Sequence, residues 1–156
     1  MLKAGIITGI FGLFLGVGVA LVSPLCVPCV ALFLGLIAGF LSGLFDKPRE
    51  GTETIKTGAL AGLVAGIILA LGQFSGAAIN SIVVGPEGAA QFMGNWGMYP
   101  NVDATVYWIG MLGTTLCFGV LDILLVAGFG VLGGLVWGVF LRKDDPSQAI
   151  MIDIDA

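Results

Sequence analysis

The first group of residues whose types and spacing suit chemistry is a pair of cysteines. Cys26 and Cys29 enclose Val27 and Pro28 in a Cys-Val-Pro-Cys motif. Two cysteines at this spacing can form a reversible disulfide, and a helix N-terminus favours the thiolate form. The motif predicts thiol redox chemistry, a structural disulfide or a pair of unreactive thiols.

A second group is polar and lies inside long apolar runs. Asp122 is flanked by Val120, Leu121 and Ile123, and an earlier apolar run contains Gln73 and Asn80, seven residues apart and therefore on one helical stripe. A carboxylate within a membrane is costly and is by default a candidate for an ion or proton role. These three residues predict a polar intramembrane site. The alternative for Asp122 is an interface hydrogen bond or partial hydration.

Other chemistry is excluded by composition. The chain has no histidine and only one further cysteine, Cys117, so we expect no metal site and no cofactor. It carries no basic patch, which argues against nucleic-acid binding. No GxSxG, HExxH or P-loop motif occurs, and we therefore expect no enzymatic activity apart from the thiol oxidoreductase alternative.

Four apolar stretches must position these residues, at about 4–23, 26–45, 57–84 and 106–141. About 20 apolar residues cross the roughly 30 Å hydrocarbon core of a bilayer. Only 10% of the residues are charged, against about 25% in soluble domains. The sequence predicts an all-α integral membrane domain, residues 1–143, in which four transmembrane helices form two hairpins within a lipid bilayer. Residues 144–156 form a short acidic tail.

Glycines recur at intervals of four within these stretches. Such spacing lets membrane helices approach backbone to backbone, as in GxxxG pairs. The ladders therefore predict helix-packing seams, which either fold the bundle on itself or join it to other copies or subunits. The glycines of the three ladders are Gly35, Gly39 and Gly43; Gly58, Gly62 and Gly66; and Gly130, Gly134 and Gly138.

Orientation follows from the basic residues, which membrane proteins retain on the cytoplasmic side. A four-span arrangement places all six at one side, so we expect both termini to be cytoplasmic in a plasma (inner) membrane and residues 85–105 to form an outer loop. The six are Lys3, Lys47, Arg49, Lys56, Arg142 and Lys143.

The last apolar run is longer than one crossing requires. Its 36 residues would make a helix of about 54 Å, unless it splits into two spans near Gly128–Gly134. Counted from Leu141 at the inner boundary, a straight helix places Asp122 near the outer boundary. Trp137 is expected at the inner interface, where tryptophan is enriched.

This layout resembles the DsbB family of quinone-linked thiol oxidases in two respects. It has four spans with both ends cytoplasmic, and Cys26 and Cys29 lie at the outer start of the second span. The second cysteine pair of that family has no counterpart in residues 85–105. The glycine-laddered hairpins also resemble uncharacterised small polytopic membrane proteins of the glycine-zipper type.

From these patterns we expect a non-enzymatic multi-pass membrane protein that acts in assembly. It would form a homo-oligomer or serve as a small accessory subunit of a larger membrane complex. The alternatives are a small channel or transporter that uses Gln73, Asn80 and Asp122, and a membrane thiol redox protein that uses Cys26 and Cys29.

Overall fold

A computed structural model describes residues 2–23, 26–48, 51–95, 97 and 103–140. Within these residues the chain forms four α-helices and no strand: α1 (Leu2–Val22), α2 (Val27–Asp46), α3 (Gly51–Asn95) and α4 (Ala104–Phe140). Each is long and apolar enough to cross a membrane. The prediction of an all-α chain with four long apolar helices is confirmed. The acidic tail, 144–156, lies outside the described residues.

Local sequence explains where α2 begins and ends. Pro28 stands in its first turn, where the missing backbone N–H of proline costs no hydrogen bond. At the other end Lys47 adopts a left-handed conformation, and its backbone N–H donates to the Gly43 carbonyl at 3.0 Å. This αL closure satisfies one of the last carbonyls of the helix. Pro48 follows it and cannot continue the helical hydrogen bonding.

The start of α4 and the bend within α3 have equally local causes. An Asp103 carboxylate oxygen accepts a hydrogen bond from the Thr105 backbone N–H at 3.2 Å, which caps α4. In α3 the helical geometry is interrupted at Gly85, whose φ of 63° and ψ of 178° are accessible essentially to glycine alone. Pro86 then opens a second helical segment that continues to Asn95.

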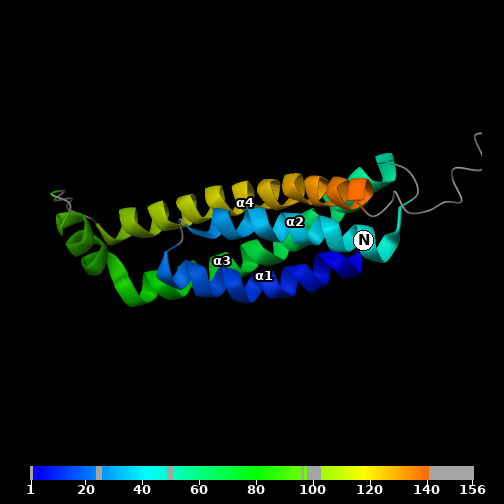
Figure 1. Cartoon of the computed structure of the whole chain (residues 1–156). Helices are drawn as coiled ribbons and strands as arrows, with labels where there is room; N and C mark the ends of the chain where they lie inside the picture. The colour runs from blue at the N-terminus through cyan, green and yellow to red at the C-terminus, as the bar shows by residue number, and fades with distance from the viewer. Residues whose placement is uncertain (1, 24–25, 49–50, 96, 98–102, 141–156) are drawn as a thin grey trace, which may run out of the picture.

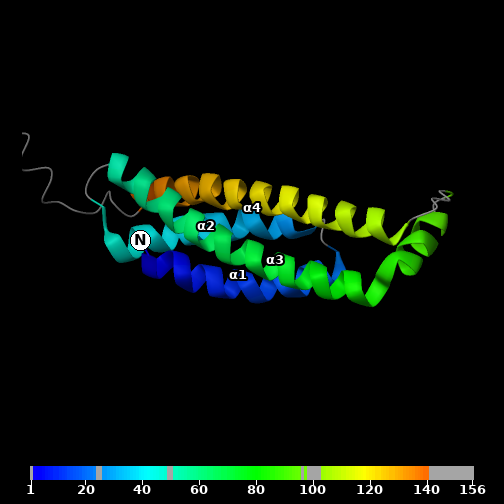
Figure 2. The same cartoon turned by 180° about the vertical axis from the view of Figure 1, so that it is seen from behind.

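The helices lie side by side, with α1 running parallel to α3 and α2 parallel to α4 (Figures 1 and 2). Contacts at successive levels give these directions. Gly5 of α1 meets Ala61 of α3 and Gly16 meets Leu69, while Gly58 meets Gly130 of α4. Since Gly66 meets Ile123, which precedes Gly130, α3 and α4 run antiparallel. The described lysines, Lys3, Lys47 and Lys56, consequently lie at or near the same end of the fold.

Several predicted boundaries differ from the structure. Helix α3 begins at Gly51 rather than near Thr57. Thr54 is buried against Gly134 of α4, and the hydroxyl of the buried Thr57 donates to the Thr54 carbonyl at 3.0 Å. The predicted outer loop, 85–105, is helical through Asn95. Helix α4 is continuous through Gly128–Gly134, so the alternative of two short spans does not apply.

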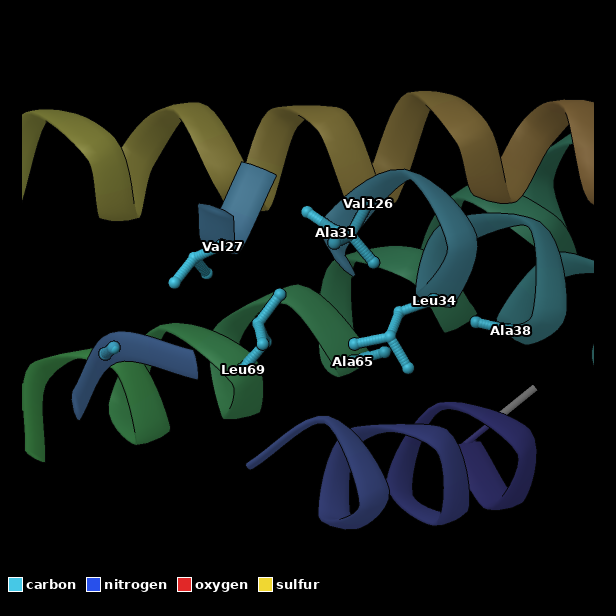
Figure 3. Packing of buried hydrophobic residues seen from close by; sticks show 8 residues of the cluster. Val27, Ala31, Leu34, Ala38, Ala65, Leu69 and Val126 are labelled. Carbon is cyan, nitrogen blue, oxygen red and sulfur yellow. The ribbon is translucent and has the colours of Figure 1, made fainter. Parts of the chain in front are cut away.

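Small side chains allow α2 to pack closely against both α3 and α4 (Figure 3). Ala31 of α2 lies beside Val126 of α4, and Leu34 projects towards Ala65 and Leu69 of α3. All five side chains are at most 2% exposed. Apolar residues on the outer faces, by contrast, remain uncovered, as expected for surfaces that contact lipid.

Helices α3 and α4 extend well beyond the ends of α1 and α2, at the end opposite the lysines (Figures 1 and 2). We call residues 79–95 and 104–118, which include this extension, the α3–α4 arm. Within the arm, the Tyr107 hydroxyl of α4 donates a hydrogen bond to the Ser81 carbonyl of α3 at 3.3 Å and so links the two helices. Beyond Gly85 the chain turns towards the start of α4 (Figure 1).

Candidate functional site

Gly130 of α4 is the point where three helices meet. A Cβ atom built on Gly39 of α2 would collide with the Gly130 carbonyl oxygen, and one built on Gly58 of α3 would lie 2.5 Å from the same oxygen. In return, a Cβ on Gly130 would lie 2.5 Å from the Gly58 carbonyl oxygen. Because the colliding atoms belong to backbone, no rotamer change relieves the overlap. Any side chain at these positions requires the helices to move apart.

The remaining ladder glycines do not all share this tight packing. Gly35 and Gly62 both face the Val126 carbonyl, and a Cβ on them would lie 2.7 and 2.5 Å from its oxygen. A Cβ on Gly66 would lie 3.0 Å from the Ile123 Cα, and a Cβ on Gly134 would lie 2.9 Å from the Thr54 carbonyl oxygen. Gly138 is different: a Cβ there would meet Thr54 Cγ2 at 3.7 Å, an ordinary contact.

Trp137 lies inside the fold and not at its outer surface. A Cβ on Gly43 of α2 would lie 2.5 Å from Trp137 Cδ2, and the indole is only 7% exposed. The expectation that Trp137 lies at the inner membrane interface stays a prediction, since burial against α2 does not fix the depth of the residue in a bilayer. The glycine at position 43 leaves the space that the ring occupies.

Sequence analysis missed one further close approach, between α3 and α1. A Cβ on Gly72 would collide with the Leu13 carbonyl oxygen, and one on Gly76 would lie 2.7 Å from the Val17 carbonyl oxygen. The signal was present in the sequence, since these two glycines are also four residues apart. The glycines in the first half of α3 thus pack against α4, and those that follow them, Gly72 and Gly76, pack against α1.

Other glycines face open space. A Cβ on Gly110, Gly113 or Gly128 of α4 would have no neighbour within 4 Å among the described residues. Gly110 and Gly113 lie in the α3–α4 arm, whereas Gly128 lies farther along α4. Contacts within the described part of the chain therefore do not require glycine at these three positions.

Asp122 and Gln73 form a buried polar pair between α4 and α3. Their exposed fractions are 0% and 1%. The Gln73 carboxamide approaches the Asp122 carboxyl, yet among the described residues neither Asp122 oxygen nor Gln73 Oε1 has a partner with hydrogen-bond geometry. Gln73 Oε1 lies 4.0 Å from the position of a Cβ on Gly119, one turn before Asp122. Three buried acceptor oxygens therefore share one region, and none of them accepts a hydrogen bond from a described residue.

The register of the helices places this pair at the level of the middle of α1. Asp122 precedes Ile123, which packs on Gly66 of α3, and the neighbouring Ala65 and Leu69 pack on Gly9 and Gly12 of α1. The expectation that Asp122 lies near the outer boundary stays a prediction. It takes Leu141 as the inner boundary, whereas α3 and α4 extend beyond the first residue of α1, as the contact of Gly134 with Thr54 shows.

Asn80 does not join this pair. It is half-buried and lies seven residues after Gln73, about 10 Å along the helix. The structure thus brings together two of the three residues that were expected to line a polar site. Gln73 and Asp122 meet because they lie on facing helices at one level.

Cys26 and Cys29 flank the first turn of α2, as the sequence predicts. Both are free thiols and both are exposed, as is Cys117 on α4. Among the described residues no three histidine, cysteine, aspartate or glutamate side chains are grouped so that they could hold a metal ion. The arrangement leaves both thiols of the motif accessible to a reagent or partner.

Comparison with protein-family models, curated proteins and solved structures found no match. The resemblances to the DsbB family and to small glycine-zipper proteins consequently remain predictions drawn from topology and short motifs.

Proposed function

We propose that this chain is a non-enzymatic integral membrane protein that acts in assembly. It would form a homo-oligomer or serve as a small accessory subunit of a larger membrane complex. In this proposal the four helices cross the membrane as a bundle packed through GxxxG-type seams. Both termini lie on the cytoplasmic side of a plasma (inner) membrane.

The lengths of the helices and the glycine contacts support the membrane bundle. Helices α1 and α2 have 21 and 20 residues, which correspond to about 30 Å each and match the hydrocarbon core. Because lipid tails are as apolar as leucine, helices in a membrane gain little from apolar burial and associate through close packing. The backbone contacts around Gly130 provide such packing. The lysines at one end support the orientation.

The observation that carries the assembly function is the uncovered apolar surface of the α3–α4 arm. Helix α4 has 37 residues and is about 55 Å long, so it exceeds a 30 Å core by about 25 Å. If α1 and α2 set the membrane level, the arm lies at or beyond the outer interface. Its exposed apolar residues are Ile79, Ile82, Val83, Val84, Phe92, Val106, Trp108, Ile109, Leu112 and Leu116.

Contact with a second protein would remove this surface from water. Large uncovered apolar patches on proteins mark interaction sites. Gly110 and Gly113 add two small positions on the same part of α4 where another helix can approach closely. The ladder glycines around Gly130 are already filled by neighbouring helices, whereas Gly110 and Gly113 of the arm are open to another helix.

The decisive experiment is extraction from the native membrane in a gentle detergent, followed by native mass measurement. A defined homo-oligomer or a complex with other membrane proteins supports the proposal, and a monomer that binds nothing contradicts it. Gly113→Leu should weaken the assembly while the monomer stays folded. Gly128→Leu is the matched control, because it makes the same exchange at an equally open position of α4 outside the arm.

One observation favours a second candidate function, a small channel or transporter. The buried pair Gln73 and Asp122 is polar at a level where the surrounding helices are apolar. Solute or ion flux through the purified protein in liposomes, lost in Asp122→Asn, would support this candidate. Absence of flux with the unaltered protein would remove it and leave the assembly proposal unaffected.

A further inference from the structure

The Gln73–Asp122 pair has more acceptor oxygens than its donors satisfy, because the N–H groups of the Gln73 carboxamide have no hydrogen-bond geometry to either Asp122 oxygen. Burial of a polar group without a hydrogen bond is costly, and an isolated buried charge costs far more. Both Asp122 oxygens and Gln73 Oε1 are buried and unpartnered within the described chain. A single hydrogen on the carboxyl would remove the charge and provide a donor for the amide oxygen at the same time.

We propose that Asp122 and Gln73 form a proton-binding site between α4 and α3. A proton from water binds one Asp122 carboxylate oxygen and gives a neutral carboxylic acid. Its O–H then donates to the Gln73 side-chain oxygen after a small rotation of the carboxamide. This inference does not rest on the assembly function, since the site needs only the contact between α3 and α4.

No other ionisable side chain in the described part of the chain is buried with Asp122. Tyr107 is half-buried and donates to Ser81 in the arm, and the others are exposed. Those on the two helices packed against α4 and on α4 itself are Cys29 and Asp46 of α2, Glu53, Lys56 and Glu87 of α3, and Tyr107 and Cys117 of α4. None of these residues is placed to neutralise a carboxylate at the level of Gln73.

A proton fits the surroundings better than a metal cation does. A hard cation such as Ca²⁺ requires six to eight oxygen ligands, whereas only three unpartnered oxygens occur here. The walls on either side are apolar, since Gly119 faces Phe74 and Ala70 and the next residue on this face of α4 is Val126. A proton requires one acceptor and no coordination shell.

Infrared spectroscopy of the full-length protein in lipid vesicles tests the site. Exposed carboxyl groups ionise near pH 4, so at neutral pH a C=O band of a protonated carboxylic acid reports a buried one. We expect this band in the unaltered protein, with a shift in D₂O, and we expect its loss in Asp122→Asn. It should persist in the control Glu87→Gln, which alters an exposed carboxyl of α3.

Two further measurements keep the outcome decisive. Gln73→Leu should move the band to higher frequency, because the acid O–H loses its acceptor. Replacing choline chloride in the buffer by sodium chloride should leave the carboxylic-acid band unchanged. Disappearance of the band when sodium is added would identify a cation site instead. Absence of the band from the folded, unaltered protein, or its persistence in Asp122→Asn, would overturn the proposal without reference to the oligomeric state.

Discussion

Replacement of Gly39 by alanine tests whether the three-helix contact at Gly130 holds the fold together. The new Cβ would collide with the Gly130 carbonyl oxygen and lie 2.7 and 2.9 Å from the Gly130 carbonyl carbon and Cα. Ordinary carbon contacts are about 3.5–4.0 Å, so α2 and α4 must separate by about 1 Å. A gap of 0.5–1 Å forfeits about a quarter to a half of each affected van der Waals contact.

The expected cost is the cost of overpacking, about 1–3 kcal/mol. Alanine also gains about 1 kcal/mol over glycine in helix propensity, which partly offsets this cost. Gly128→Ala gains the same propensity at a position with no neighbour within 4 Å among the described residues. The difference in unfolding free energy between the two variants therefore isolates the steric cost, with Gly39→Ala the less stable by about 1–3 kcal/mol.

Thermal or denaturant unfolding in detergent micelles measures this difference. Circular dichroism reports the helices. With Trp96 and Trp108 replaced by phenylalanine in every variant, the fluorescence of Trp137 reports the same interface, because Trp137 packs on Gly43 in the next turn of α2. Equal stability of Gly39→Ala and Gly128→Ala would refute the close approach of α2 and α4. A loss of helix content in both variants would contradict the assignment of Gly128 to an open surface.

Two further predictions concern the outer end of the molecule. Gly85→Ala places a side chain at φ 63°, which costs about 1–3 kcal/mol, and should speed hydrogen exchange in residues 86–95, whereas the control Gly94→Ala should not. Cys26 and Cys29 are exposed and should react with a membrane-impermeant maleimide added outside intact cells, in a Cys117→Ala background. Labelling of these two thiols only after the cells are opened would reverse the proposed orientation.

Much of the fold followed from local patterns in the sequence. An apolar run of about 20 residues predicts a helix that can cross a membrane wherever the run lies, and all four helices were found. Boundaries that depend on contacts were less accurate. The start of α3 at Gly51 depends on burial of Thr54 against α4, and the helix after Pro86 depends on the geometry of Gly85.

The sequence by itself determined the apolar character of the chain, the positions of its glycines and the isolation of Asp122 among apolar residues. Only the tertiary structure decided which glycines are filled by a neighbouring helix, as at Gly39, and which face open space, as at Gly113. It also paired Asp122 with Gln73, left Asn80 two turns away and placed the pair at the level of the middle of α1. The physical reason is that hydropathy and spacing are properties of one helix, whereas depth and pairing depend on how far each helix slides along its neighbours before their backbones meet.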